Sequence, residues 1–218
     1  MTSEVLRRLT VVFTDFEGRL EQTPVIRKLT RGRFTIEDYR VFLLQWRQQV
    51  KDGALWMSRA ASNIDEAHFE LRSTLMKHAV TEHRDFRLLE EDYVASGGAL
   101  SEIQGGEKNV GSEALSAWMF HEASQPNPFG LLGAMWIIEG LGSIKAREWG
   151  LAIQKALALP DDAVRFLLYH GENDAEHMEE FKAMLAMVLP DDAVARRIVR
   201  TAEVTARLYA LQMEEILP

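Results

Sequence analysis

Apolar residues recur at helical spacing along almost the whole chain, and runs that alternate between apolar and polar residues are nearly absent. The first pattern is typical of amphipathic helices, whereas half-buried strands would produce the second. Only six prolines interrupt the 218 residues, so the helices can be long. We therefore predict an all-α protein, a bundle of seven to eight helices that forms a single domain over residues 1–218.

Local start and stop signals set the expected helix boundaries. In "TIED", Thr35 and Asp38 occupy the positions of a capping box, and Pro24 suits the first position of a short helix. The motif "LPDDAV" occurs twice, and in each copy a proline followed by two aspartates favours a helix N-terminus. The glycine-rich segment 96–112 predicts a long loop. The expected helices cover about residues 3–21, 24–29, 36–62, 65–95, 113–123 and 129–157, and two more end at about residues 189 and 216.

Composition excludes several classes of function. The formal net charge of -8 argues against a nucleic-acid partner, because binding to phosphates requires clustered Lys and Arg. The absence of cysteine excludes disulfides, thiolate metal sites and a cysteine nucleophile. The N-terminal segment is charged and does not resemble a signal peptide, and the longest apolar stretch, Phe129–Ile138, is too short to span a bilayer. We expect a cytoplasmic protein with no membrane partner.

The segment "LLYHGENDAEHMEEF" concentrates possible metal ligands. His170, Asp174 and His177 are spaced i, i+4 and i+7, which places them on one face of a helix. Imidazole nitrogen and carboxylate oxygen are ligands that iron, manganese and zinc accept. Because the segment is rich in acids, the alternative is an ordinary solvated polar face.

Two other segments offer inward-facing ligands. Glu139 follows an almost wholly apolar run, where an isolated charge would be costly unless it were paired with Arg147 or Lys145 or bound to a metal. His78, Glu82 and Asp85 repeat the i, i+4, i+7 spacing, although charged helical faces of this kind are common. Because three predicted helices each contribute a carboxylate or an imidazole, and bundle cores are where such sites are built, we predict a metal centre.

The segments "NPFGLLGAMWIIEG" and "YHGENDAEH" resemble the heme-oxygenase-like iron proteins, and the resemblance extends from about Trp46 to the C-terminus. This superfamily includes thiaminase II and pyrroloquinoline-quinone synthase, which lack a metal, and the heme-oxygenase-like diiron oxidases and oxygenases. The resemblance to the diiron branch implies that Glu139 is the central Glu, that Glu82 comes from an earlier helix, and that the late helix supplies the His170 triplet.

One position departs from the pattern of that branch. The third residue after Glu82 is Asp85, where the family usually has His. Either Asp85 or His78 completes the second iron site, or that site is weak, or only one metal binds. The heme branch is disfavoured because no convincing proximal His lies near the N-terminus.

The resemblance implies an O₂-dependent non-heme iron oxidase or oxygenase with Fe(II), two ions per chain, that acts on a small organic acid or amine. It also implies a homodimer. We expect the substrate pocket to run along the apolar interior beside Trp46, Trp136 and Tyr169.

Three alternatives remain open. A metal-free protein like thiaminase II or the quinone synthase would bind or transform a small heterocycle, although the thiaminase cysteine is absent here. A ferritin-like carboxylate protein would need Glu-x-x-His on two helices, whereas the late helix offers Asp174-x-x-His177. A non-catalytic helical interaction module would contain neither a metal nor a pocket.

Overall fold

A computed structural model describes residues 2–189 and 191–217, with the side chains of all of these except 172–178. The described residues are helical and contain no strand, which confirms the predicted all-α class. None of the described helices is both long and apolar enough to cross a membrane. The α-helices are α1 (Thr2–Leu20), α2 (Pro24–Thr30), α3 (Ile36–Ser62), α4 (Phe69–Glu82), α5 (Phe86–Ala95), α6 (Leu100–Gly105), α7 (Val110–Ala123), α8 (Leu131–Leu141), α9 (Arg147–Leu157), α10 (Arg165–Val188) and α11 (Asp192–Glu214).

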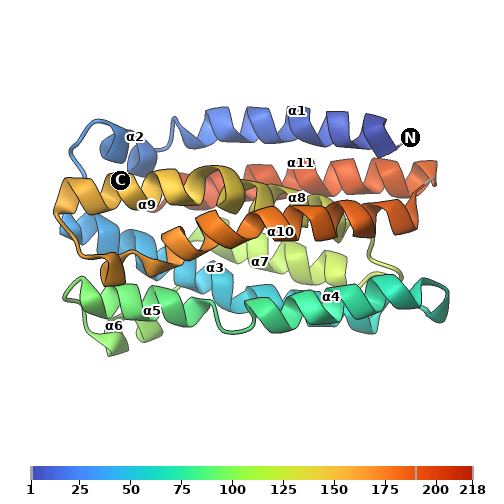
Figure 1. The fold of residues 1–218 in the computed structure, drawn as a ribbon, viewed down its shortest axis with the longest axis horizontal. Helices are drawn as coiled ribbons and strands as arrows, with labels where there is room; N and C mark the ends of the chain where they lie inside the picture. The colour runs from blue at the N-terminus through green and yellow to red at the C-terminus, as the bar shows by residue number, and fades with distance from the viewer. Residues whose placement is uncertain (1, 190, 218) are drawn as a thin grey trace.

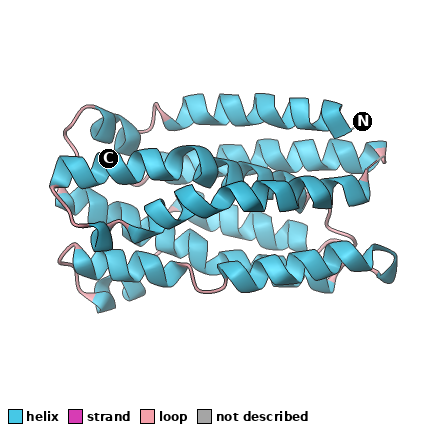
Figure 2. Cartoon of the chain, in the orientation of Figure 1, coloured by secondary structure: helices cyan, strands magenta, loops and turns pink. Residues whose placement is uncertain are grey.

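The helices form one elongated bundle around a continuous apolar core (Figure 1). In this bundle α11 packs against α1, α7 and α8, whereas α3 packs against α4, α5 and α7. Helices α4 and α5 lie end to end along one edge, and α10 crosses the bundle between them and α8–α9 (Figure 1). Most loops lie at the ends of the bundle, but the break between α4 and α5 lies midway along its length (Figure 2).

The break between α4 and α5 corrects the prediction of one helix over residues 65–95. The amide nitrogens of Asp85, Arg87 and Leu88 donate to the carbonyl oxygens three residues earlier, at distances of 3.2, 2.9 and 3.0 Å. This tighter pattern interrupts the α-helix without any glycine or proline, so none of the residues that usually end a helix marks the break. The predicted loop 96–112 also proves to be partly helical, since it contains α6 and the beginning of α7.

Two predicted helix starts are confirmed. The Asp38 amide donates to Thr35 Oγ1 at 3.2 Å, and Asp38 Oδ2 accepts from the Thr35 amide at 2.8 Å, which completes the capping box. In the second "LPDDAV" copy, Asp191 Oδ1 accepts from the amides of Ala193 and Val194 and begins α11.

The first "LPDDAV" copy does not cap α10 as predicted. Asp161–Ala163 form a short 3-10 turn, and the side chain that caps α10 is Asp92 of α5. Its two carboxylate oxygens accept from the amides of Arg165 and Phe166 at 2.8 and 3.0 Å. Tyr39 of α3 donates to the Ala163 carbonyl oxygen at 2.7 Å. The start of α10 is therefore fixed by two other helices.

A wide helical turn joins α8 to α9. Residues Gly142–Ala146 form a π-helix. The predicted helix 129–157 is therefore helical from residue 131 to residue 157, but it changes from α-helix to π-helix and back. Gly171 of α10 lies against this junction, because a Cβ atom on Gly171 would come within 2.5 Å of Arg147 Cβ and 2.7 Å of the Arg147 backbone nitrogen. Only glycine lets α10 approach so closely at this point.

Replacing Asp92 with alanine should lower the free energy of unfolding by about 2 kcal/mol or more, because two buried amides would lose their acceptor. Asp162→Ala is the matched control, since Asp162 is exposed and belongs to the motif that does not cap α10. We expect its effect to stay within about 0.5 kcal/mol. Urea unfolding followed by circular dichroism measures both, and equal effects would contradict the assignment of the cap.

Gly171→Ala should destabilise the protein by about 1–3 kcal/mol, since the added methyl group collides with the backbone of Arg147. Gly18→Ala in α1 is the control, because a Cβ atom there would meet nothing within 4 Å. That variant should be neutral or more stable by up to about 1 kcal/mol. Thermal unfolding of both variants compares them, and a neutral Gly171→Ala would rule out the close helix contact.

Candidate metal centre

The break between α4 and α5 places two carboxylates opposite a histidine of α10. Ligand atoms of Glu82, Asp85 and His170 all lie within 4.8 Å of one another. Asp85 Oδ2 lies 3.3 Å from His170 Nε2. Asp85 and His170 are buried and Glu82 is half-buried. Three residues predicted as ligands, from segments some 85 residues apart in the chain, are thus brought together.

A second histidine–carboxylate pair involves the two remaining described candidates. His78 Nε2 lies 3.2 Å from Glu139 Oε1, and His78 Nδ1 lies 3.4 Å from Glu180 Oε2. Both His78 and Glu139 are buried. Lys145, a possible partner of Glu139 on sequence grounds, instead contacts Glu17 at 2.9 Å. The described contact of Glu139 is therefore with an imidazole that could share a metal with it.

Two of the predicted ligands cannot be assessed in this structure. The backbones of Asp174 and His177 belong to α10, but their side chains lie outside the described residues. Their predicted role as ligands stays a prediction.

The electrostatics of the site favour binding of a cation. Burial, and then the negative charge of Glu139, raise the pKa of Glu82 to about 7. Asp85 acts in the same direction, while His170 and His78 lower the pKa. A bound cation would offset both effects, because it stabilises the charged form of a buried carboxylate and balances the neighbouring negative charge. Oxygen and imidazole donors of this kind fit iron, manganese or zinc.

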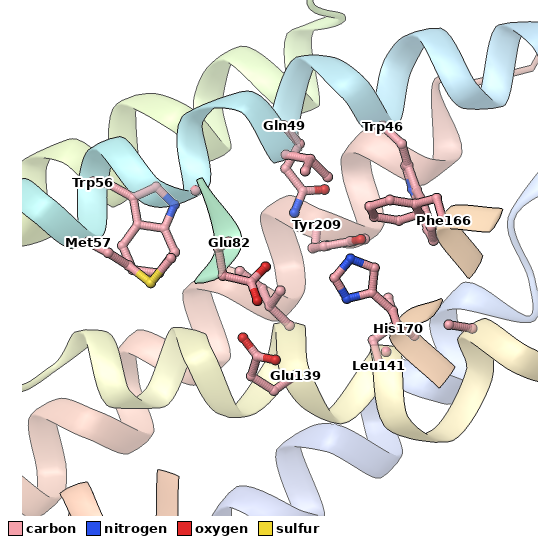
Figure 3. A pocket seen from close by; sticks show the side chains of 15 residues that line it. Trp46, Gln49, Trp56, Met57, Glu82, Glu139, Leu141, Phe166, His170 and Tyr209 are labelled. Carbon is pink, nitrogen blue, oxygen red and sulfur yellow. The ribbon is translucent and has the colours of Figure 1, made fainter. Parts of the chain in front are cut away.

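A cavity of about 90 Å³ adjoins these residues (Figure 3). Glu82, Glu139 and His170 lie along one part of its wall. The rest of the wall is mostly aromatic and aliphatic and comes from α3, α8, α10 and α11, with side chains that include Trp46, Trp56, Met57, Ile138, Leu141, Phe166 and Tyr209.

Of the three predicted pocket residues, only Trp46 lines this cavity. Trp136 turns toward α1, where its Nε1 donates to the Leu9 carbonyl oxygen at 3.1 Å. Tyr169 is 46% exposed, because neighbouring positions on a helix point about 100° apart and His170 points inward. Both residues are close in sequence to a candidate ligand, Glu139 or His170, but neither lines this cavity.

Sequence reasoning did not single out three other residues of the wall. Gln49 follows Trp46 by three positions and Phe166 precedes His170 by four, so helical spacing could have identified both. Tyr209 belongs to α11, and only the packing of α11 brings it to the cavity.

Without metal, the stability of the protein should fall as the pH rises from about 4.5 to about 7. The folded state raises the pKa of Glu82 to about 7 from 4.5, so folding is favoured while Glu82 is protonated. Burial also raises the pKa of Asp92 to about 7, and this residue adds to the same trend. Glu82→Gln should remove the contribution of Glu82 and flatten the curve.

Urea unfolding in the presence of a chelator, at several pH values across this window, measures the effect. The His121→Ala variant is a control, since His121 is exposed on α7. Parallel curves for the wild type and Glu82→Gln would mean that Glu82 titrates normally.

Comparison with known proteins identifies the family and the fold. The family model described as "Iron-containing redox enzyme" matches residues 40–210. A domain of unknown function with a heme oxygenase-like fold from Shewanella denitrificans superposes with a TM-score of 0.87 at 20% identity, covering 95% of this chain and 89% of that one. No curated protein matches the chain.

Two further solved structures share the fold. A TenA homolog from Pseudomonas syringae has a TM-score of 0.79 at 15% identity, over 97% of this chain and 92% of that chain. Heme oxygenase-2 from Synechocystis, solved with heme and NO, has a TM-score of 0.68 at 16% identity, over 97% and 84%. Together with the family match, which spans most of the chain, these similarities show that the protein has a heme oxygenase-like fold and belongs to the family of iron-containing redox enzymes.

Proposed function

We propose that this protein is an O₂-dependent non-heme iron oxidase or oxygenase with two irons per chain. The observation that carries the proposal is the buried cluster of Glu82, Asp85 and His170 at the wall of an apolar cavity. Membership of a family of iron-containing redox enzymes supports iron as the metal.

The contacts suggest how the ligands divide. Asp85 lies with Glu82 and His170, so we propose that these three hold one iron. His78 lies against Glu139, and we propose that this pair holds the second. Asp174 and His177 would add to the ligand set from the same helix as His170. In this arrangement Asp85 and His78 both serve, and the family's usual His after Glu82 is not required.

The side chains around the cluster support the same chemistry. Iron bound there would supply the activation of O₂ for removing hydrogen from a substrate or inserting oxygen into it. Trp46 and Phe166 form an apolar wall that excludes water and holds a substrate beside the cluster. In the metal-free protein Glu82, with a pKa of about 7, is partly protonated near neutral pH, and iron binding would displace that proton.

One observation favours a second candidate function. The His78–Glu139 and His170–Asp85 pairs, at 3.2 and 3.3 Å, also make a polar network that needs no metal. A metal-free protein that binds a small heterocycle would keep this network, as the fold shared with a TenA homolog allows. The two candidates differ in whether the cluster takes up iron.

Anaerobic titration of the metal-free protein with Fe(II) tests the proposal. We expect about two irons per chain, and a change in the visible spectrum after O₂ is added. His170→Ala and Glu82→Gln should each weaken iron binding about tenfold or more, because each removes a ligand. His121→Ala should bind iron as the wild type does, since His121 is exposed and distant in sequence from every candidate ligand.

The number of irons bound distinguishes the remaining possibilities. One iron, lost in His170→Ala but retained in His78→Ala, would restrict the site to Glu82, Asp85 and His170. Binding no stronger than that of His170→Ala would favour the metal-free candidate.

A further inference from the structure

The wall of the cavity contains a hydrogen-bond donor that is not a candidate metal ligand, the hydroxyl group of Tyr209. Gln212 Nε2 donates to Gln49 Oε1 at 3.2 Å, which fixes the orientation of the Gln49 amide. The NH₂ group of Gln49 donates to the Tyr209 hydroxyl oxygen. This hydrogen bond lowers the pKa of Tyr209, which burial raises. The Tyr209 oxygen is thus an acceptor from Gln49, and its own O–H proton is left to donate. No hydrogen bond from this hydroxyl reaches another described residue, and Tyr209 lines the cavity.

Trp56 supplies a second donor. Its indole N–H can only donate, and the ring is buried in the wall of the cavity. The nitrogen-bearing edge of Trp56 faces the interior of the pocket in Figure 3, and within the described part of the chain no acceptor takes up this N–H. Trp46 differs, because its Nε1 donates to Met213 Sδ at 3.2 Å. The indole N–H of Trp56 is therefore available to a ligand in the cavity, whereas that of Trp46 is already used.

The charges around the cavity limit what can bind there. No Lys or Arg lines it. Segment 172–178, "ENDAEHM", contains none either, so its undescribed side chains cannot contribute one. The charged groups of the wall are therefore the candidate metal ligands themselves. Away from the metal, an anionic group would be buried without a counter-ion, and a cationic group would meet donors where it needs acceptors.

Size and shape add a further limit. A volume of about 90 Å³ has room for roughly six water molecules, so it suits a small ring better than a long chain. Trp46 packs against Phe42 at 4.4 Å and against Phe166 at 5.7 Å between ring centroids. These contacts hold the aromatic wall in place before any ligand arrives.

We propose that the pocket takes a small, flat, uncharged molecule with a hydrogen-bond acceptor, such as a carbonyl oxygen or a ring nitrogen, that Tyr209 and Trp56 bind. This narrows the expected substrates from acids and amines to neutral carbonyl compounds or heterocycles. The inference rests on the proposed function for the reaction that follows, but the binding itself requires no metal.

Four planar molecules of nearly equal size test the inference. Acetophenone carries a neutral acceptor, α-methylstyrene replaces that oxygen with a methylene group, benzoate is an anion and benzamidinium is a cation. Isothermal titration calorimetry would use the full chain, both without metal and loaded anaerobically with Fe(II). Without metal, acetophenone should bind about tenfold more tightly than α-methylstyrene, the equivalent of one to two good hydrogen bonds. Without metal, benzoate should bind more weakly than acetophenone, because no cation of the wall balances its charge. Benzamidinium can pair with Glu82 and Glu139 in the metal-free protein, so it should bind more weakly than acetophenone in the Fe(II)-loaded protein, where the metal neutralises these carboxylates.

Variants assign the preference to particular donors. Tyr209→Phe should weaken acetophenone binding about five- to tenfold and leave α-methylstyrene within about twofold of the wild type. Trp56→Phe should act in the same direction and provides a second variant if the first does not fold. Tyr93→Phe is the control, because the Tyr93 hydroxyl bonds to Glu102 and the residue does not line the cavity. In the wild type, acetophenone should also shift the indole N–H resonance of Trp56.

Three results would overturn the inference: equal binding of acetophenone and α-methylstyrene, tighter binding of benzoate than of acetophenone without metal, or no binding of any of the four molecules at millimolar concentration. Preference for acetophenone in a protein that takes up no Fe(II) would refute only the proposed function. Normal iron uptake without preference for acetophenone would refute only the substrate class.

Discussion

The fold of this protein depends on keeping carboxylates and imidazoles buried in the middle of a helical bundle. Isolated charges there would be costly, so each must meet an opposite charge, a hydrogen-bond donor or a metal. Asp85 meets His170, and Glu139 meets His78. These contacts join α4, α5, α8 and α10. The same side chains therefore hold four helices together and form the candidate metal site.

Departures from regular α-helix occur where these groups converge. The tight turn after Glu82 ends α4 and keeps Asp85 in the same cluster as Glu82. The π-helix begins three residues after Glu139, and Gly171, next to His170, permits close contact with the residue that follows that π-helix. Wide turns of this kind are common at functional sites, where they adjust the direction of a side chain without ending the helix.

The cavity separates two kinds of recognition. The candidate ligands in its wall carry the charge, and burial followed by the negative charge of Glu139 raises the pKa of Glu82. Tyr209 and Trp56, in the same wall, offer neutral donors among aromatic side chains. This division lets a metal and an uncharged substrate occupy adjacent sites without competing for the same groups. Gln49 and Gln212, on α3 and α11, form a hydrogen bond with each other, and Gln49 lowers the pKa of Tyr209 that burial raises.

The sequence by itself determined the helical class, two of the helix caps and the identity of the candidate ligands, because periodicity, capping and burial of charge are local properties of a helix. It could not reveal the turn after Glu82, since no glycine or proline marks it, or the cap of α10, since Asp92 lies on another helix. The pairing of Asp85 with His170 and the approach of Tyr209 to the cavity were likewise decided by tertiary structure. The physical reason is that spacing along one helix specifies which side chains share a face, while the partner of that face is set only when helices pack against each other.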